Sequence, residues 1–512
     1  MTSKEYSAET ASASSSQNGT NDTVHIGEKQ ADGALLFLRH NAEALPTSSS
    51  EQELQRVRRK VDYRIIPLLF LIYFLNFIDK ILLNYANVMG ISRDLRLRGN
   101  DFSNASSAFW IAVLLAEIPN MFLLQRLSTG KWLGFCLACW GICTACTAGT
   151  SNYSGLLTTR ILSGAFESTV PPALMQITGR WYVRQELISR VVLWYLGTAS
   201  GFIFGGLISW AFQNVGSSAT LAPWRIMFLA LGCFTVIVGI CVMVLVPETP
   251  MDAKFLRNDE KKALLDHVKQ NQTGVCNKQL QSRQIKEAFT DFQLWAQWLI
   301  MLLNGGGGGV ITAYSSTLIR SFGYMPKQAA LLNMGSGGVG ITACLLSTLV
   351  VRKTGHRWIG IIMVAVPTII GAGLMSFLSS RNQSGSLAGI YLVNASIAMV
   401  PIQFSWMITN VSGQTKRSIG FTVLNAAFAL GNIIGPQTFQ ARDAPTYVPA
   451  RLSMFIMQCI IVAVSICLVL YYRRQNKIRD ARGTATDSSK LSYEEAFQEE
   501  TDKRRPNFRY AY

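Results

Sequence analysis

Residues 64–88 read RIIPLLFLIYFLNFIDKILLNYANV, and this stretch combines the two properties that decide the fold. It is predominantly apolar over 25 residues, and a helix needs about 20 such residues to cross ~30 Å of hydrocarbon. Its interior also contains the adjacent charged residues Asp79 and Lys80. A charge at the bilayer centre costs at least ~2.5 kcal/mol, so it is normally kept only where it faces a polar cavity and meets a partner. The stretch therefore predicts a membrane helix that carries part of a buried polar site.

The rest of the chain repeats this apolar pattern. Of the 512 residues, 49% are hydrophobic and only 15% are charged, whereas soluble domains carry about 25% charged residues. We expect an all-α membrane protein with twelve transmembrane helices, because twelve apolar runs are long enough to span a bilayer. These runs cover residues 64–88, 105–125, 131–149, 155–177, 189–212, 224–246, 294–319, 327–350, 358–378, 387–408, 419–440 and 452–472.

The predicted spans fall into two groups of six around a polar linker. Both tails are rich in polar residues and are predicted to be disordered. No cleavable signal peptide is expected, because the first 50 residues lack the apolar core that one needs. The expected divisions are a tail at 1–60, a six-helix half at 61–246, a linker with short helices at 247–293, a second six-helix half at 294–472 and a tail at 473–512.

The net charge of +17 is distributed unevenly around the predicted spans. With both termini assigned to the cytoplasm, the tails and cytoplasmic loops hold 36 of the 47 Lys and Arg residues, and the outside loops hold nine. This asymmetry follows the positive-inside rule and predicts that both termini are cytoplasmic. Basic clusters beside a span are then explained by contact with anionic lipid, and no nucleic-acid partner is expected.

Two sequence matches indicate that the halves are related pseudo-symmetrically. Residues 123–134, LLQRLSTGKWLG, resemble residues 349–360, LVVRKTGHRWIG, at an offset of 226. The fourth and tenth spans match at an offset of 230, and parallel six-span repeats are typical of one large class of alternating-access carriers. This second match pairs Gly155 with Gly385, Leu162 with Leu392, Ala165 with Ala395, Val170 with Val400 and Pro171 with Pro401.

Four charged residues lie within the predicted spans, and all belong to the first half. They are Asp79, Lys80, Arg160 and Glu167. Arg160 and Glu167 are seven residues apart, about two helical turns, so they project from one face of a helix. At the repeat offset their counterparts are Ile390 and Ile397. The second half instead offers neutral polar side chains, namely Asn304, Asn394, Gln403, Asn425 and Asn432.

The intramembrane charges predict a site that handles an anion and a proton. Arg binds carboxylates with bidentate geometry, and we expect Arg160 and Lys80 to hold a substrate carboxylate. The chain has four histidines and none lies in a span, so a proton carrier in the membrane must be a carboxylate. Burial favours the neutral form of a carboxylic acid, and a nearby cation favours the charged form. We expect Arg160 to pair with Glu167, and we expect protonation of Glu167, or of Asp79, to release Arg160 from its internal partner.

The alternative for these four residues is a fixed salt-bridge cluster that only sets helix packing. Asp79 and Lys80 are neighbours on one helix and point about 100° apart, so they cannot both face one partner squarely.

Neutral residues complete the predicted site. We expect Tyr73, Asn76, Asn304 and Gln403 to line the cavity, although a hydrogen bond between helices explains each of them alone. Near the inner ends of the second and third spans, gating roles are predicted for Glu117, Arg126 and Lys131, and an ordinary interfacial position is the alternative for Glu117. We find no metal-ligand set and no nucleophile–base pair, so no metal, no cofactor and no enzymatic activity are expected.

Several segments carry a resemblance to a known family. They are YFLNFIDKILLNYA at 73–86, RILSGAFESTVPP at 160–172, NVSGQTKRSIG at 410–420, GNIIGPQTF at 431–439 and DAPTY at 443–447. Through them the chain resembles the major facilitator superfamily, and within it the anion:cation symporter family and its fungal allantoate permease branch. The general loop motif of the superfamily is degenerate here, as Gln125-Arg126 followed by Gly130-Lys131.

The resemblance implies uptake of small organic anions coupled to protons, often carboxylates such as allantoate, nicotinate or other vitamin-like acids. It also implies that Asp79 and Glu167 are protonatable and that Lys80 and Arg160 are the basic site residues. We therefore predict a monomeric, proton-coupled importer of a small organic anion in the plasma membrane. The alternatives are an exporter of an acidic metabolite and a nutrient sensor that does not transport.

Overall fold

Every expected span is helical in the structure, a computed structural model that describes most of the chain. The described residues are 51–182, 184–214, 221–247, 250–269, 282–378, 382–440, 443, 447–481, 501–504 and 508–512. All contacts reported below lie within one unit, residues 46–512.

The first half contains α2 (Glu51–Met89), α3 (Ile91–Asp94), α4 (Asp101–Arg126), α5 (Thr129–Thr147), α6 (Tyr153–Glu167), α7 (Val170–Trp181), α8 (Arg184–Gln213) and α9 (Pro223–Leu245). The linker holds η1 (Pro250–Asp252), α10 (Asn258–Lys269) and α11 (Ser282–Phe289). The second half contains α12 (Phe292–Ser321), α13 (Pro326–Thr354), α14 (Arg357–Phe377), α15 (Gln383–Val393), η2 (Asn394–Ala398), α16 (Met399–Asn410), α17 (Gln414–Gln437) and α18 (Val448–Ala481).

Within the described residues, nine helical segments are long and apolar enough to cross a membrane. They lie in α2, α4, α8, α9, α13, α14, the α15–α16 segment, α17 and α18. The remaining expected spans correspond to α5, the α6–α7 pair and α12. The twelve spans predicted from apolar runs are thus all covered by helix, and the predicted fold class is confirmed.

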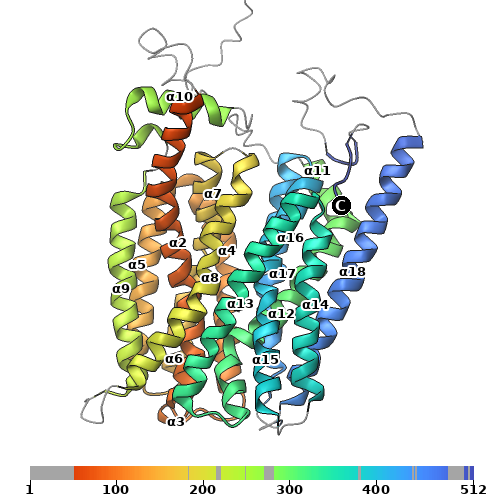
Figure 1. Cartoon of the computed structure of the whole chain (residues 1–512). Coiled ribbons are helices and arrows are strands. Elements are labelled where there is room, and N and C mark those ends of the chain that lie inside the picture. The colour runs from red at the N-terminus through yellow and green to blue at the C-terminus, as the bar shows by residue number, and fades with distance from the viewer. Residues whose placement is uncertain are drawn as a thin grey trace, which may run out of the picture. The chain divides into compact units, whose positions relative to one another are not determined.

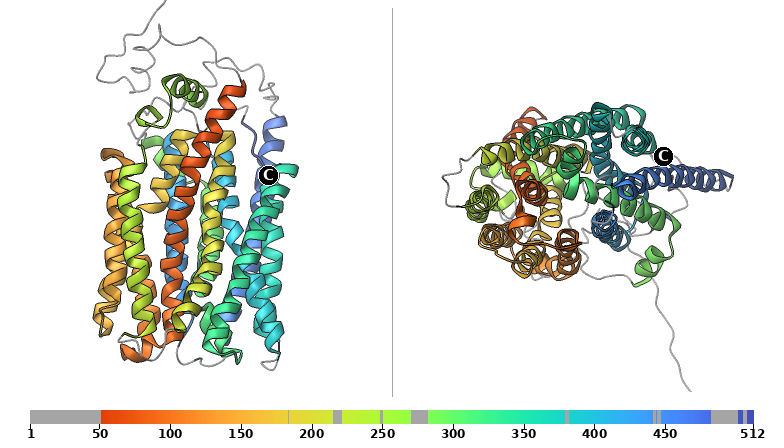
Figure 2. Two further views of the ribbon diagram at one scale, coloured as in Figure 1. Left: turned by 60° about the vertical axis from the view of Figure 1, so that its left-hand side comes forward. Right: turned by 90° about the horizontal axis from the view of Figure 1, so that it is seen from below.

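The helices run along a common direction and form two groups, α2–α9 and α12–α18 (Figures 1 and 2). The groups meet where α8 packs on α13, α4 on α17 and α2 on α12. The α8–α13 contact needs a glycine, because a Cβ added at Gly337 would lie 2.4 Å from the carbonyl oxygen of Ala199.

The two halves share an interrupted helix at equivalent places. Asn152 precedes α6 and its side chain accepts the N–H of Gly155 at 2.8 Å, and Asn382 precedes α15 and accepts the N–H of Gly385 at 3.0 Å. The fourth span is broken between α6 and α7, and the tenth span is broken by η2. The sequence repeat at an offset of 230 therefore has a structural counterpart in both the cap and the break.

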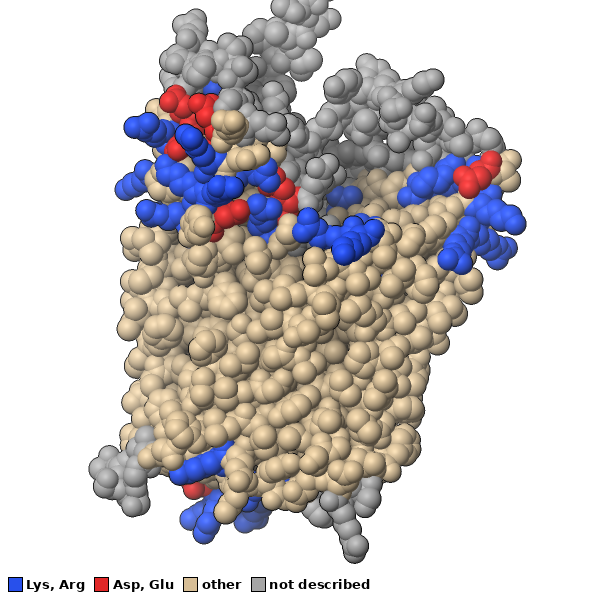
Figure 3. Space-filling view, in the orientation of Figure 1, with Lys and Arg blue, Asp and Glu red and all other residues tan. Residues whose placement is uncertain are grey.

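The two ends of the bundle differ in charge. We use "basic end" for the end where α2 begins and α18 finishes, and "opposite end" for the end that holds α3. On the face shown in Figure 3, Lys and Arg gather over α10 and the end of α18, above a broad band that shows neither basic nor acidic side chains. Such a band is what hydrocarbon requires of a surface in contact with it.

The boundaries of the predicted tails need correction. Helix α2 begins at Glu51, nine residues before the expected end of the first tail, because Val57 and Val61 are buried in the core beside Leu264 of α10. The helix is also held by an ion pair of Lys60 with Glu260 at 2.8 Å. Helix α18 continues to Ala481, beyond residue 472, and residues within 501–504 and 508–512 contact the second half. The prediction for residues 1–50 lies outside the described residues.

Candidate functional site

The interior of α2 brings its polar side chains toward α6. Asp79, Asn76, Arg160 and Glu167 are each between 2% and 4% exposed, and Lys80 is half-buried beside them. Arg160 and Glu167 lie on one face of α6, as their seven-residue spacing predicts. The four intramembrane charges therefore form one cluster inside the first half.

The charges pair across the two helices in a crossed arrangement. Nη1 of Arg160 lies 3.4 Å from Oδ2 of Asp79, and the ammonium of Lys80 forms an ion pair with Glu167. The predicted internal pairing of Arg160 with Glu167 is therefore wrong. Adjacent positions on α2 point about 100° apart and Arg160 and Glu167 are two turns apart on α6, so each charge on α2 meets a different charge on α6.

Neutral groups support each pair. The amide of Asn76 donates to Glu167 at 2.7 Å and accepts from the ammonium of Lys80 at 2.8 Å. The hydroxyl of Thr144 on α5 donates to Asp79 at 2.8 Å. Asn76, predicted as a cavity residue, thus orients the Lys80–Glu167 pair.

Arg160 is only partly satisfied. Its Nε and Nη2 are buried and have no hydrogen-bond partner among the described residues, and its one carboxylate contact is 3.4 Å long. Charge-assisted N–H···O bonds are usually about 2.7–2.9 Å long. Leaving buried charged donors unpaired is costly, so this guanidinium is suited to a further acceptor. Oε2 of Glu167 is likewise buried without a hydrogen-bond partner in the part of the chain that the structure describes.

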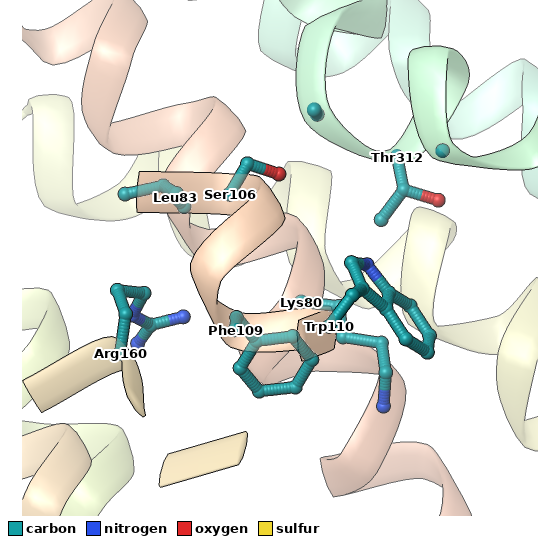
Figure 4. A pocket seen from close by; sticks show the side chains of 9 residues that line it. Lys80, Leu83, Ser106, Phe109, Trp110, Arg160 and Thr312 are labelled. Atoms are coloured by element: carbon teal, nitrogen blue, oxygen red, sulfur yellow. The ribbon is translucent and has the colours of Figure 1, made fainter. Parts of the chain in front are cut away.

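A small cavity adjoins Arg160 and Lys80 (Figure 4). The ring of Phe109 on α4 lies between the two cations, 6.0 Å from the guanidinium and 5.6 Å from the ammonium. Trp110 faces the Lys80 ammonium at 5.5 Å, and Thr312 of α12 closes the cavity from the second half. The cavity thus combines two cations with aromatic walls, which is a surface for an anion that also carries an apolar part.

The other predicted cavity residues lie elsewhere. The ring of Tyr73 packs on Trp194 and Tyr195 of α8, with centroids 4.7 and 5.2 Å away. Asn304 on α12 is buried, and its Oδ1 accepts no hydrogen bond from the described residues. The amide of Gln403 on α16 donates to the carbonyl of Gln297 at 3.3 Å. None of these three residues lines the cavity beside Arg160.

The predicted gating residues separate into two kinds. Glu117 on α4 is hydrogen-bonded to Asn425 of α17, so it joins the two halves. Arg126 and Lys131 are exposed at the basic end, where α4 ends and α5 begins. Neither forms an ion pair within the described part of the chain.

A second polar network was not predicted from the sequence. Near the opposite end, Asn84 of α2 donates to the hydroxyl of Ser315 at 2.8 Å and accepts the N–H of Ser316 at 3.2 Å. Asn333 of α13 donates to the hydroxyl of Tyr85 at 3.2 Å and to Ser315 at 3.0 Å. These five residues, which we call the outer network, join the halves one turn beyond Lys80. The available signal was an asparagine within each of two predicted spans, Asn84 in 64–88 and Asn333 in 327–350.

More hydrogen bonds join the halves at the opposite end. Gln437 donates to Asn104 at 3.2 Å and to Ser107 at 3.0 Å, and Asn100 donates to Gln440 at 2.8 Å. With the outer network, they seal the halves together on that side of the charged cluster.

Comparisons with known proteins agree with this architecture. The family model of the Major Facilitator Superfamily matches residues 69–436. The thiamine pathway transporter THI73 of Saccharomyces cerevisiae is 31% identical, over 96% of this chain and 95% of its own length. The allantoate permease of the same yeast is 30% identical, over 95% of this chain and 91% of its own length.

A solved structure supports the fold at lower sequence identity. The xylose transporter XylE from E. coli superposes with a TM-score of 0.60 at 15% identity, over 79% of this chain and 97% of that chain. The family model, the two yeast relatives and the helical architecture together show that this chain is a multi-pass membrane protein of the major facilitator superfamily, a family of transporters.

Proposed function

We propose that the chain is a proton-coupled symporter that imports a small organic carboxylate across the plasma membrane by alternating access. The observation that carries this proposal is the partly satisfied guanidinium of Arg160 beside a cavity. A carboxylate in the cavity supplies two acceptors in the planar geometry that Arg prefers. Lys80, 13% exposed at its side chain, is the second cation available to the same anion.

Charge balance supports coupling to protons. When all four are ionised, Asp79, Lys80, Arg160 and Glu167 carry no net charge. A bound monoanion therefore leaves one uncompensated negative charge in a buried site, which is unfavourable. One proton on Asp79 or Glu167 restores neutrality, so we infer one proton for each monocarboxylate.

The crossed pairs give each proton a specific consequence. Protonation of Asp79 neutralises the one carboxylate among the described residues that contacts Arg160, and protonation of Glu167 neutralises the ionic partner of Lys80. Either event frees a cation for the substrate. Loss of the proton re-forms the internal pair and displaces the anion, which is how proton release drives substrate release in this scheme.

The orientation follows from the charge asymmetry. Lys and Arg concentrate at the basic end, and positive charge is retained on the cytoplasmic side. With the basic end in the cytoplasm, the hydrogen bonds at the opposite end seal the outer side. Such a seal on the outer side supports release of substrate toward the cytoplasm in this scheme.

Uptake of labelled compounds tests the proposal. Cells that express the chain are given nicotinate, pantothenate, allantoate, biotin or a simple dicarboxylate at external pH 5 and 7.5, with thiamine as a cationic comparison. We expect one carboxylate to accumulate more at pH 5 and to lose its accumulation with an uncoupler. Uptake of thiamine alone, or efflux without uptake, contradicts import of an anion.

A further inference from the structure

The segment formed by residues 501–504 and 508–512, here called the tail segment, is bound at the basic end of the second half. The N–H of Tyr510 donates to Oδ1 of Asn476 and its carbonyl accepts from Nδ2, both at 2.9 Å. Asn410 binds the backbone of Ala511 in the same way. Its side chain accepts the N–H of Ala511 at 2.7 Å and donates to the carbonyl at 2.9 Å. Two asparagine side chains, at the ends of α16 and α18, thus each hold one residue of an extended peptide by its backbone.

An ionic anchor holds the other end of the tail segment. Lys416 at the start of α17 is fully buried and contacts Asp502 at 2.7 Å, Asp291 at 2.6 Å and Glu287 at 2.9 Å. Asp502 is also fully buried and accepts the hydroxyl of Tyr510 at 2.8 Å. A buried lysine needs such partners, and Asp502 is the partner that the tail segment supplies.

The turn before Lys416 shapes this groove. Gly413 has φ of 93°, and a Cβ there would lie 2.8 Å from Oε1 of Gln284 on α11. This turn places Asn410 and Lys416, at the ends of two successive helices, against the same peptide. The segment NVSGQTKRSIG, which carries part of the family resemblance, thus forms part of the groove.

The tail segment contacts the ends of two interrupted or glycine-rich helices. Helix α12 starts beside Asp291 and contains five consecutive glycines at 305–309, and a Cβ at Gly308 would meet nothing within 4 Å. Helix α16 ends at Asn410 and is separated from α15 by η2. Glycine runs and helix interruptions are both places where helices bend. Two parts of the second half are therefore best able to move separately. One is the portion of α12 between its glycine run and the basic end, and the other is the portion of α16 between η2 and the basic end.

We propose that the tail segment is an intramolecular latch that fixes the basic ends of α12 and α16 to α17 and α18. Docked, it holds these two helix ends in the arrangement seen here. Released, it lets them bend at the glycine run and at η2. The tail segment thus controls the mobility of the second half at the end that opens to release substrate.

Hydrogen–deuterium exchange on the purified full-length chain tests the latch. The variants are a chain that ends at residue 500 and Asn410→Ala, which removes both bonds to Ala511. We expect exchange in residues 292–304 and 399–410 to rise at least about tenfold, because several buried hydrogen bonds are lost. Exchange in α5 and α9, which lie in the first half, should not change. Arg504→Gln is the control, because Arg504 is exposed and its one ion pair in the described residues, with Glu287, is long at 4.0 Å.

Two further outcomes decide the proposal. Asn476→Ala should speed exchange in the full chain and have no added effect in the chain that ends at residue 500, because its partner is then absent. If exchange rises evenly over the whole second half, the tail segment stabilises that half as a whole, and the latch is overturned. Unchanged exchange in both helix ends overturns docking itself. Tyr510→Phe removes the hydroxyl contacts with Asp502 at 2.8 Å and with Arg479 at 3.4 Å, and it keeps the test available if the shortened chain fails to fold.

Discussion

The fourth and tenth spans have the same backbone plan and opposite chemistry. Both start at an asparagine that caps their first helix. Both are interrupted where that helix ends, between α6 and α7 in the fourth span and at η2 in the tenth. Yet α6 carries Arg160 and Glu167, whereas the equivalent positions of the tenth span hold Ile390, which is fully buried, and Ile397. A duplicated fold therefore does not imply a duplicated site.

This difference indicates a division of labour between the halves. In our scheme the first half holds the anion and the proton, and the second half closes the cavity through Thr312 and the outer network. The second half also buries neutral amides such as those of Asn304 and Gln403, whose oxygens lack hydrogen-bond partners within the described residues. The predictions below test how far this asymmetry extends.

Removing the guanidinium should have the largest effect. Arg160→Gln is expected to lower uptake at least about 100-fold, because it removes the bidentate anion contact and leaves Asp79 buried without a cation. Uptake and the amount of the protein at the cell surface are measured together. The double variant Arg160→Gln with Asp79→Asn removes the unpaired charge and should restore surface amount but not uptake. Uptake above about a tenth of the wild-type rate in either variant argues against a substrate contact.

The coupling carboxylate should control the response to pH. Glu167→Gln is expected to abolish the rise in uptake between external pH 7.5 and 5. Without the Glu167 carboxylate, Lys80 has no ionic partner that a proton could neutralise, so proton binding no longer frees Lys80 for the substrate. Exchange of labelled for unlabelled substrate across the membrane should continue. If this variant still accumulates substrate against a gradient with full pH dependence, Glu167 is not the proton carrier.

The crossed pairing can be measured directly. Double-mutant cycles on thermal unfolding should give a coupling of about 1–3 kcal/mol for Lys80 with Glu167 and for Arg160 with Asp79. The cycle for Arg160 with Glu167 should give less than about 0.5 kcal/mol. Neutral replacements, Gln for Lys, Arg and Glu and Asn for Asp, keep the side-chain sizes close. A large coupling for Arg160 with Glu167 restores the pairing that the sequence suggested.

The sequence predicts the fold well because span length and apolar content are properties of each segment alone. The crossed pairing could not be predicted in this way, since it depends on the relative height of α2 and α6. A one-turn shift between them changes which carboxylate Arg160 meets. The four charges were identified because each violates the apolar pattern of its own span, which needs no knowledge of neighbours.

Long-range polar contacts were beyond the reach of the sequence. Asn84 and Ser315 are 231 positions apart and each is unremarkable in its own helix. The tail segment was predicted as disordered because its charged and polar residues outnumber apolar ones. Its docking depends on a groove that other helices build around Asn410 and Asn476.

The outer network should respond more weakly than the charged site. Asn333→Ala removes hydrogen bonds to Tyr85 and Ser315, and each net bond contributes about 0.5–1.5 kcal/mol. We expect a shift toward opening at the opposite end, seen as roughly threefold to tenfold faster hydrogen exchange around residues 310–321. Asn382→Ala, which removes only the α15 cap, should leave this region unchanged. Equal effects of both variants contradict a specific seal.

The smallest effect is expected at Gln403, and it is the sharpest test of the asymmetry. Gln403 was predicted to bind substrate, but its side chain lies against Gln297 and its Oε1 has no partner within the described residues. Replacing a poorly satisfied buried amide with an apolar side chain of similar shape is nearly neutral. Gln403→Met should therefore change the uptake rate and the apparent KM by less than about threefold. An apparent KM that rises tenfold or more, with an unchanged amount of protein at the cell surface, means that an amide of the second half contacts the substrate. The proposed division of labour between the halves is then wrong.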